Sequence, residues 1–310
     1  MTEVVVITLF SSGLALMVPV LLAALGEAVS EQAGVLNVGI EGTMLFGAAI
    51  CALVGVNTSS VALSLLAGTA TGAGAGVVLS ALYVRRGTDQ IVTGLLFNIF
   101  ALGLTGILVS QVIIGNIAPT LSPWTVPLLG RIPKLRDVLN EQNFLFWISI
   151  LLAVVIFYLL RRSWWGLYVR AAGERPHASS SAGLDVWRLR YAAVIAGNAL
   201  AGLGGAALVV GTSGRFIPGF TSGRGFIALG VVVVARWNPL AVVAVAGLFG
   251  LSQALQFVAG LVSFFDPVPD QFWLALPYIV TVAAVAVSRG SRDPAAVGIP
   301  WREPAAEARS

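Results

Sequence analysis

Apolar runs of about twenty residues recur along most of this 310-residue chain. A helix of that length spans the hydrocarbon core of a bilayer, which is roughly 30 Å thick. Hydrophobic residues make up 57% of the chain and charged residues only 10%, and no polar stretch is long enough to form a separate soluble domain. We therefore expect an all-α polytopic membrane protein with eight or nine spanning segments, broken or re-entrant helices and possible inverted repeats.

The predicted spans follow these apolar runs. The first run lacks a basic n-region, so it is expected to be a span and not a cleavable signal peptide. The run from Phe226 to Ala235 covers only about 15 Å as a helix, which predicts half of a broken helix or a tilted span that borrows its polar flanks. The other expected spans are 4–24, the run that contains Glu41 and ends near residue 56, 61–84, 91–114, 144–160, 191–211, 240–262 and 272–287.

A polar stretch, Arg161–Arg190, interrupts the apolar pattern and orients the scheme. It contains six arginines, two acids and the only histidine of the chain. If it is cytoplasmic, Arg85, Arg86 and Arg236 fall on the same side, as the positive-inside rule requires. The C-terminus is then cytoplasmic and the N-terminus external, although the basic cluster at 131–136 becomes an external exception.

This scheme divides the chain simply. Residues 1–290 form a single transmembrane domain that includes the cytoplasmic loop, and residues 291–310 form a polar cytoplasmic tail. Within the loop, Pro176 suits the first position of a helix and Gly183 suits the left-handed residue that ends one. So short a helix has no apolar face to bury. It is therefore suited to binding by another protein, although a loop that only connects two spans is the alternative.

Several classes of function are excluded by what the chain contains. Its single cysteine, Cys51, and single histidine rule out an intrachain disulfide and most metal clusters. The glycines at 72–76 are not followed by Lys and Ser/Thr, so no phosphate-binding loop for ATP is present. The basic residues flank apolar segments and are not interleaved with aromatics, which argues against a nucleic-acid partner.

Glu41 is an ionisable residue inside an apolar run. Such a side chain costs several kcal/mol in lipid unless it faces protein or water. It therefore lines a pathway, together with nearby Asn37, or makes a structural hydrogen bond between helices. Asn98 shares one face of its predicted helix with Gly94, Ala101 and Thr105, and this small, polar face should point into the protein.

Four stretches resemble a known family and occur in its order along the chain. They are EAVSEQAGVLNVGIEGTMLFG at 27–47, DQIVTGLLFNIFALGLT at 89–105, RAAGERPHASSSAGLDVWRLRY at 170–191 and GRGFIALGVVVVARWNP at 223–239. They are similar to permease subunits of bacterial ABC importers in the branched-chain amino acid and simple sugar permease group. Within this group the chain most resembles nucleoside-type permeases that work with a lipoprotein of the basic membrane protein family.

The resemblance implies a multi-pass subunit of the bacterial plasma (inner) membrane that is not an enzyme and binds no cofactor or metal. ATP and Mg would be bound by separate ABC ATPase subunits. The other partners would be a second permease, either a paralogue or a second copy, and an extracytoplasmic substrate-binding lipoprotein.

The resemblance also implies roles for particular residues. The short helix of the loop would be the coupling helix that contacts the ATPase, and its match lies at Gly173, Glu174, Pro176, Ala178, Gly183 and Asp185. Ser179 and Ser180 depart from the alanine and the acidic or asparagine residue that relatives commonly have.

For the substrate pathway, Asn37 and Asn98 are candidates for nucleobase or ribose contacts, because amides both donate and accept hydrogen bonds. Phe97 and Phe226 are candidates for stacking on a base. The alternatives are hydrogen bonds between helices for the amides and ordinary packing for the phenylalanines.

Two other functional readings stay open. The scaffold also serves permeases for branched-chain amino acids and simple sugars. A proton- or sodium-coupled secondary transporter, with Glu41 as its coupling acid, is a further alternative. An intramembrane enzyme is disfavoured because the spans contain no recognisable metal constellation or pair of nucleophile and base.

Overall fold

The computed structural model describes residues 2–108, 116–124, 133–259, 268–287 and 293–301. Within these ranges the chain is helical and forms no strand. Seven of the helices are long and apolar enough to cross a membrane, and two shorter apolar helices accompany them. The predicted all-α polytopic class is therefore confirmed.

The helices follow the order of the apolar runs. They are α1 (Thr2–Gln32), α2 (Ile40–Thr58), α3 (Val61–Ser80), which continues as a π-helical turn (Ala81–Arg85), α4 (Gln90–Leu108), α5 (Pro133–Asn140), α6 (Phe144–Arg162), α7 (Trp164–Glu174), α8 (Pro176–Ser181), α9 (Val186–Val210), α10 (Arg224–Val234), α11 (Pro239–Ala259) and α12 (Asp270–Val287).

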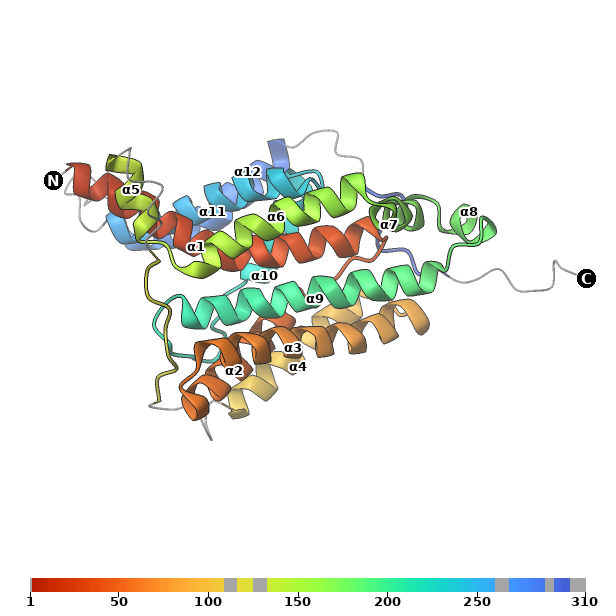
Figure 1. Ribbon diagram of the computed structural model, residues 1–310, viewed down its shortest axis with the longest axis horizontal. Coiled ribbons are helices and arrows are strands. Elements are labelled where there is room, and N and C mark those ends of the chain that lie inside the picture. The colour runs from red at the N-terminus through yellow and green to blue at the C-terminus, as the bar shows by residue number, and fades with distance from the viewer. Residues whose placement is uncertain (1, 109–115, 125–132, 260–267, 288–292, 302–310) are drawn as a thin grey trace, which may run out of the picture.

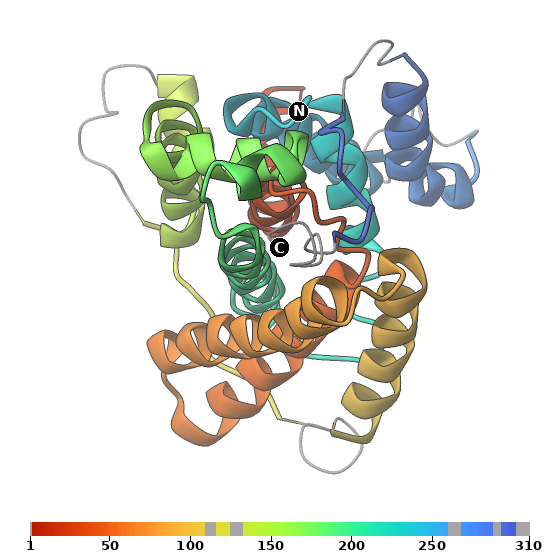
Figure 2. The same cartoon turned by 90° about the vertical axis from the view of Figure 1, so that its right-hand side faces the viewer.

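α1, α6 and α9 lie roughly along the long direction of the molecule, with α7 and α8 at one end and α5 and the N-terminus at the other (Figure 1). Viewed from the α7 end, α1 and α9 lie near the middle of the bundle (Figure 2). α9 packs against α1, α2 and α3, and α1 also packs against α11. The buried core is formed mainly by the facing sides of these helices.

Small residues allow α9 to approach its neighbours closely. Asn198, Gly202 and Gly205 share one face of this helix by their spacing and are all buried. At Gly202, an added Cβ would lie 2.5 Å from the carbonyl oxygen of Gly68 and 2.7 Å from the Cα of Gly72. Backbones that approach this closely tolerate only glycine, as is common between helices in membranes.

Capping residues set several helix starts. The side chain of Asn143 accepts hydrogen bonds from the backbone nitrogens of Leu145 and Phe146 at the start of α6. Pro239 is the first residue of α11, a position where its missing N–H costs nothing. α10 has only 11 residues, which matches the short apolar run noted in the sequence.

α1 is longer than predicted. The expected end at Ala24 is wrong, because the helix continues to Gln32 and buries Glu27 and Glu31. The backbone between α1 and α2 is irregular only over residues 33–39, where Gly34 has a φ of +87°. The two carboxylates are accommodated in the helix because each finds a hydrogen-bond donor elsewhere in the chain.

Candidate functional site

The loop between α6 and α9 forms the end of the molecule where α7 and α8 lie. The predicted short helix is confirmed, since α8 begins at Pro176 and Gly183 follows it with a φ of +86°. Pro176 and Ser179 are buried, whereas Glu174 and Ala178 are exposed. α8 is therefore anchored on one side and open to solvent on the other.

Gly173 and Asp185 hold this loop in place. Gly173 is buried, and a Cβ there would overlap the carbonyl oxygen of Gln32, so the end of α7 lies directly on the end of α1. Asp185 caps α9 by accepting a hydrogen bond of 3.0 Å from the backbone nitrogen of Arg188, and pairs with its guanidinium at 2.9 Å. Of the residues matched for coupling, Gly173 and Pro176 are buried, and Glu174, Ala178, Gly183 and Asp185 are exposed. The Asp185 carboxylate is already bonded within the loop, which leaves Glu174 as the exposed charged side chain of this set without such a bond.

The segment 293–301, part of the predicted polar tail, packs on the same loop. The backbone nitrogen of Ala296 donates to the carbonyl oxygen of Gly173 at 2.9 Å. Arg190, which is 1% exposed, donates from Nη1 to the carbonyl oxygen of Ile299 at 3.3 Å. Trp301 is buried against Ala172 and Val186. The segment 293–301 therefore links the C-terminal end of α7 to the start of α9, and we call it the brace.

We expect Trp301→Ala to release this brace. Removing a buried tryptophan side chain costs about 3 kcal/mol or more, since it leaves a cavity. Hydrogen exchange should accelerate at the Ala296 amide, which can be followed by mass spectrometry of peptides from 293–301. Trp164→Ala is the control, because Trp164 is 75% exposed. Equal protection in wild type and Trp301→Ala would contradict the brace.

The predicted pathway residues gather around the start of α2. Asn37 and Glu41 belong to this region. Asn98 of α4 binds the backbone before and after the start of α2. Its Nδ2 donates to the carbonyl oxygen of Val38 at 2.9 Å, and its Oδ1 accepts from the backbone nitrogen of Gly42 at 2.8 Å. Asn98 therefore holds the turn into α2, which is the structural alternative considered for it.

Asn37 lies inside a buried polar network. Its Nδ2 donates to Asn198 Oδ1 at 3.0 Å, and Thr43 Oγ1 donates to the same oxygen at 2.7 Å. Its backbone nitrogen donates to Glu27 Oε1 at 2.8 Å, and its own Oδ1 accepts from the Tyr83 hydroxyl at 3.4 Å. The network connects α1, α2, α9 and the end of α3, so the Asn37 amide is occupied by protein groups in this conformation.

Glu41 binds the segment that leads into α10. Its Oε1 accepts from the Thr221 hydroxyl at 2.6 Å and from the Gly223 nitrogen at 2.8 Å, and its Oε2 accepts from the Gly225 nitrogen at 2.6 Å. The carboxylate thus satisfies free N–H groups at the start of α10, where the helix dipole also favours a negative charge. Glu41 ties α2 to α10.

The two phenylalanines have different surroundings. Phe97 is half-buried and meets Phe46 edge to face, with ring centroids 5.7 Å apart. Phe226 is 43% exposed on α10, one residue after Gly225. The structure thus places Phe226 on an outer surface and Phe97 among other aromatic rings.

Two buried acids were not among the predicted site residues. Glu27 Oε1 accepts from the backbone of Asn37, and Glu31 accepts from the indole nitrogen of Trp237. Their spacing of four residues, on one face of a helix that continues an apolar run, was the available signal. Among the described residues, no three His, Cys, Asp or Glu side chains are grouped to hold a metal.

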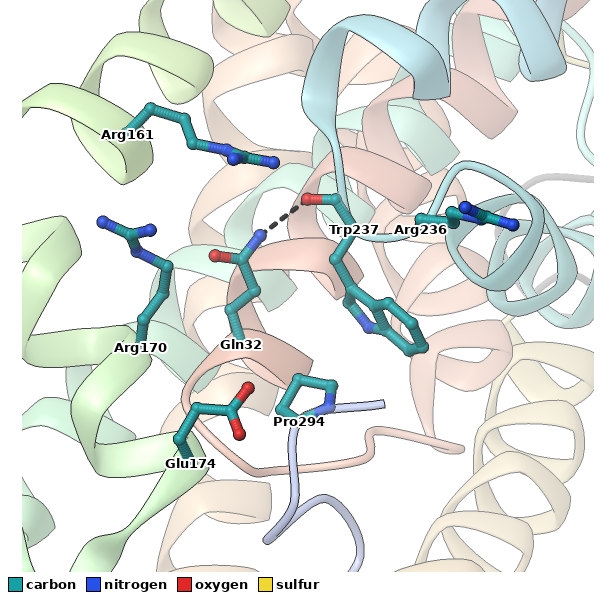
Figure 3. A pocket seen from close by; sticks show the side chains of 7 residues that line it. All are labelled: Gln32, Arg161, Arg170, Glu174, Arg236, Trp237 and Pro294. Carbon is teal, nitrogen blue, oxygen red and sulfur yellow. Dashed lines mark hydrogen bonds between the residues drawn. The ribbon is translucent and has the colours of Figure 1, made fainter. Parts of the chain in front are cut away.

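A pocket of about 260 Å³ lies beside the loop. Arg161 at the end of α6, Arg170 of α7 and Arg236 between α10 and α11 line it, together with Gln32 and Glu174 (Figure 3). Gln32 Nε2 donates to the carbonyl oxygen of Trp237 at 2.6 Å. The pocket thus forms where the ends of several long helices meet.

The chain matches a family model described as branched-chain amino acid transport system / permease component, over residues 9–285. It is 32% identical to the guanosine ABC transporter permease protein NupQ of Bacillus subtilis, covering 91% of this chain and 92% of that protein. It is 31% identical to the nucleoside ABC transporter permease protein NupC of Lactococcus lactis, covering 88% and 89%.

A third relative is the putative glucose ABC transporter permease protein TsgC13 of Haloferax volcanii, 33% identical over 86% of this chain and 87% of that protein. No solved structure matches the chain significantly. The similarity extends over nearly the whole membrane domain and includes the loop with α7 and α8.

Proposed function

The chain belongs to the family of branched-chain amino acid transport system permease components, and from this membership we propose that it is the membrane-spanning subunit of an ATP-driven nucleoside importer. The observation that carries the nucleoside assignment is similarity over about nine tenths of the chain to permeases named for guanosine and for nucleosides. The alternative cargo is a simple sugar, favoured by the similarity to the glucose permease, or a branched-chain amino acid.

In this proposal the loop with α8 faces the cytoplasm and receives separate ATPase subunits. Three arginines support this orientation. Arg161, Arg162 and Arg236 lie at the ends of apolar helices at or beside this loop. Basic residues at the ends of membrane spans are retained on the cytoplasmic side. A second permease completes the pathway, and an extracytoplasmic lipoprotein delivers the substrate. The contacts of Glu41 then join α2 to α10, the helix that follows the segment 211–223 on the outer side.

The test is uptake of labelled guanosine by cells without nucleoside uptake of their own. The cells express this chain with its second permease, ATPase and lipoprotein. We expect uptake that an ATPase-inactive partner abolishes and that excess adenosine inhibits, whereas excess glucose or leucine does not. Inhibition by glucose or leucine alone would replace the nucleoside assignment, and gradient-driven uptake by vesicles holding this chain alone would favour the ion-coupled alternative.

The exposed side of α8 offers a direct test of coupling. Ala178→Trp places a large side chain on the surface where we propose that the ATPase docks, so co-purification of the ATPase should fall about tenfold or more, since a clash of about 1.4 kcal/mol already changes an equilibrium tenfold. Thermal unfolding of the permease should not change, because Ala178 is exposed. Asn57→Trp is the control, because Asn57 is exposed near the C-terminal end of α2. Unchanged ATPase binding by Ala178→Trp would place the docking surface elsewhere.

A further inference from the structure

The pocket at the helix ends has an excess of positive charge. Its charged lining residues are three arginines and one glutamate. Among the described residues, Arg161 makes no hydrogen bond or ion pair. Arg170 donates from Nε to the carbonyl oxygen of Gly166 in its own helix, 3.2 Å away. The guanidinium groups of these two residues therefore retain donors for an anionic ligand.

The pocket also contains an unused acceptor. Gln32 is 7% exposed, and although its Nε2 is bonded, its buried Oε1 has no hydrogen-bond partner. In Figure 3 the Gln32 amide lies between the side chains of Arg161 and Arg170 on one side and Trp237 on the other. A buried acceptor without a partner costs free energy. A ligand that offers both an anionic oxygen and a hydrogen-bond donor would satisfy both kinds of group.

The position of the pocket indicates the source of that ligand. Gln32 ends the first span, Arg161 lies at the end of the span Phe144–Arg162, and Arg236 precedes the span Pro239–Ala259. α7, which supplies Arg170, exposes Trp164, Leu167 and Tyr168. Exposed tryptophan and tyrosine beside helix ends are typical of the depth at which lipid headgroups lie.

We infer that this pocket binds the headgroup of a membrane glycerophospholipid, with Arg161 and Arg170 on its phosphate and Gln32 Oε1 accepting from a headgroup hydroxyl or ammonium. Arginine matches phosphate oxygens through paired, charge-assisted hydrogen bonds. A net positive lining favours an anionic lipid such as phosphatidylglycerol, which carries both a phosphate and hydroxyl donors. Phosphatidylcholine carries the phosphate but no donor.

Native mass spectrometry of the purified full-length chain in detergent tests the inference. Phosphatidylglycerol, phosphatidylcholine and inorganic phosphate are added separately. We expect phosphatidylglycerol to bind about fivefold or more tightly than phosphatidylcholine, since it adds both a hydrogen-bond donor for Gln32 and a net negative charge. The double variant Arg161→Gln, Arg170→Gln should bind it about tenfold or more weakly. Arg162→Gln, a neighbouring arginine of α6 that does not line the pocket, should bind as wild type.

Each variant is first compared with wild type by thermal unfolding in lipid-free detergent, so that loss of folding is separated from loss of binding. Unchanged phosphatidylglycerol binding by a folded double variant would overturn the inference. Displacement of the lipid by millimolar inorganic phosphate would do the same, because it would indicate a site for soluble phosphate. If the ATPase partner displaces the lipid and the same two substitutions abolish ATPase binding, the pocket is a protein contact instead.

Discussion

Gly202→Ala is expected to lower the stability of the folded membrane domain by about 3 kcal/mol. The new methyl group would meet the backbone of α3 at Gly68 and Gly72, which cannot move aside as a flexible side chain would. α9 must then separate from α3, and because α9 also packs against α1 and α2, the strain reaches the centre of the bundle. Thermal unfolding of the detergent-purified protein, read as the fraction that remains monodisperse, measures the effect.

Gly74→Ala is the matched control for this experiment. Gly74 lies on α3 close to Gly72, but an added Cβ there meets nothing within 4 Å. The same chemical change should therefore leave stability unchanged or slightly higher, since alanine favours a helix over glycine by up to about 1 kcal/mol. Equal effects at Gly202 and Gly74 would show that the contact between α3 and α9 does not limit stability.

Glu41→Ala is expected to reduce substrate uptake at least about tenfold and to destabilise the protein by roughly 3 kcal/mol, because three donors lose their acceptor. The backbone nitrogens of Gly223 and Gly225 and the hydroxyl of Thr221 would all be left unsatisfied in a half-buried place. Glu41→Gln should have an intermediate effect, since an amide keeps only one of the two accepting oxygens. Glu141→Gln, at an exposed carboxylate before α6, should have none.

Measuring both stability and uptake separates the two roles considered for Glu41. If Glu41 ties α2 to α10, stability and uptake should fall together, more in Glu41→Ala than in Glu41→Gln. A coupling acid of an ion-driven transporter should lose uptake fully in Glu41→Gln while the protein stays as stable as wild type. Normal stability and normal uptake in Glu41→Ala would exclude both roles.

The sequence was most informative where local chemistry decides the structure. Pro176 and Gly183 predicted the ends of α8, because both act on the backbone at their own positions. The short apolar run before Arg236 likewise predicted the shortness of α10. The small face of α4 at Gly94, Ala101 and Thr105 is buried as expected, since the spacing of side chains on a helix fixes which face they share.

The sequence was least informative where a polar residue depends on a distant partner. Glu27 and Glu31 lie beyond the predicted end of the first span, and the indole that binds Glu31 comes from Trp237, which no local pattern connects to it. Arg190 was read as part of a solvated loop, yet it is buried under residues near Ile299. Burying such groups is favourable only when the fold supplies hydrogen bonds, so their positions follow from tertiary contacts and not from hydropathy.

The brace formed by residues 293–301 also sets an order of events during biosynthesis. The loop with α7 and α8 leaves the ribosome before α9 to α12 and well before these residues. Until they are made, the carbonyl oxygen of Gly173 lacks the Ala296 amide, and Arg190 lacks the carbonyl of Ile299. If the proposed ATPase binds this loop, it would therefore distinguish a chain that has been synthesised as far as residue 301 from one whose translation stopped before that point.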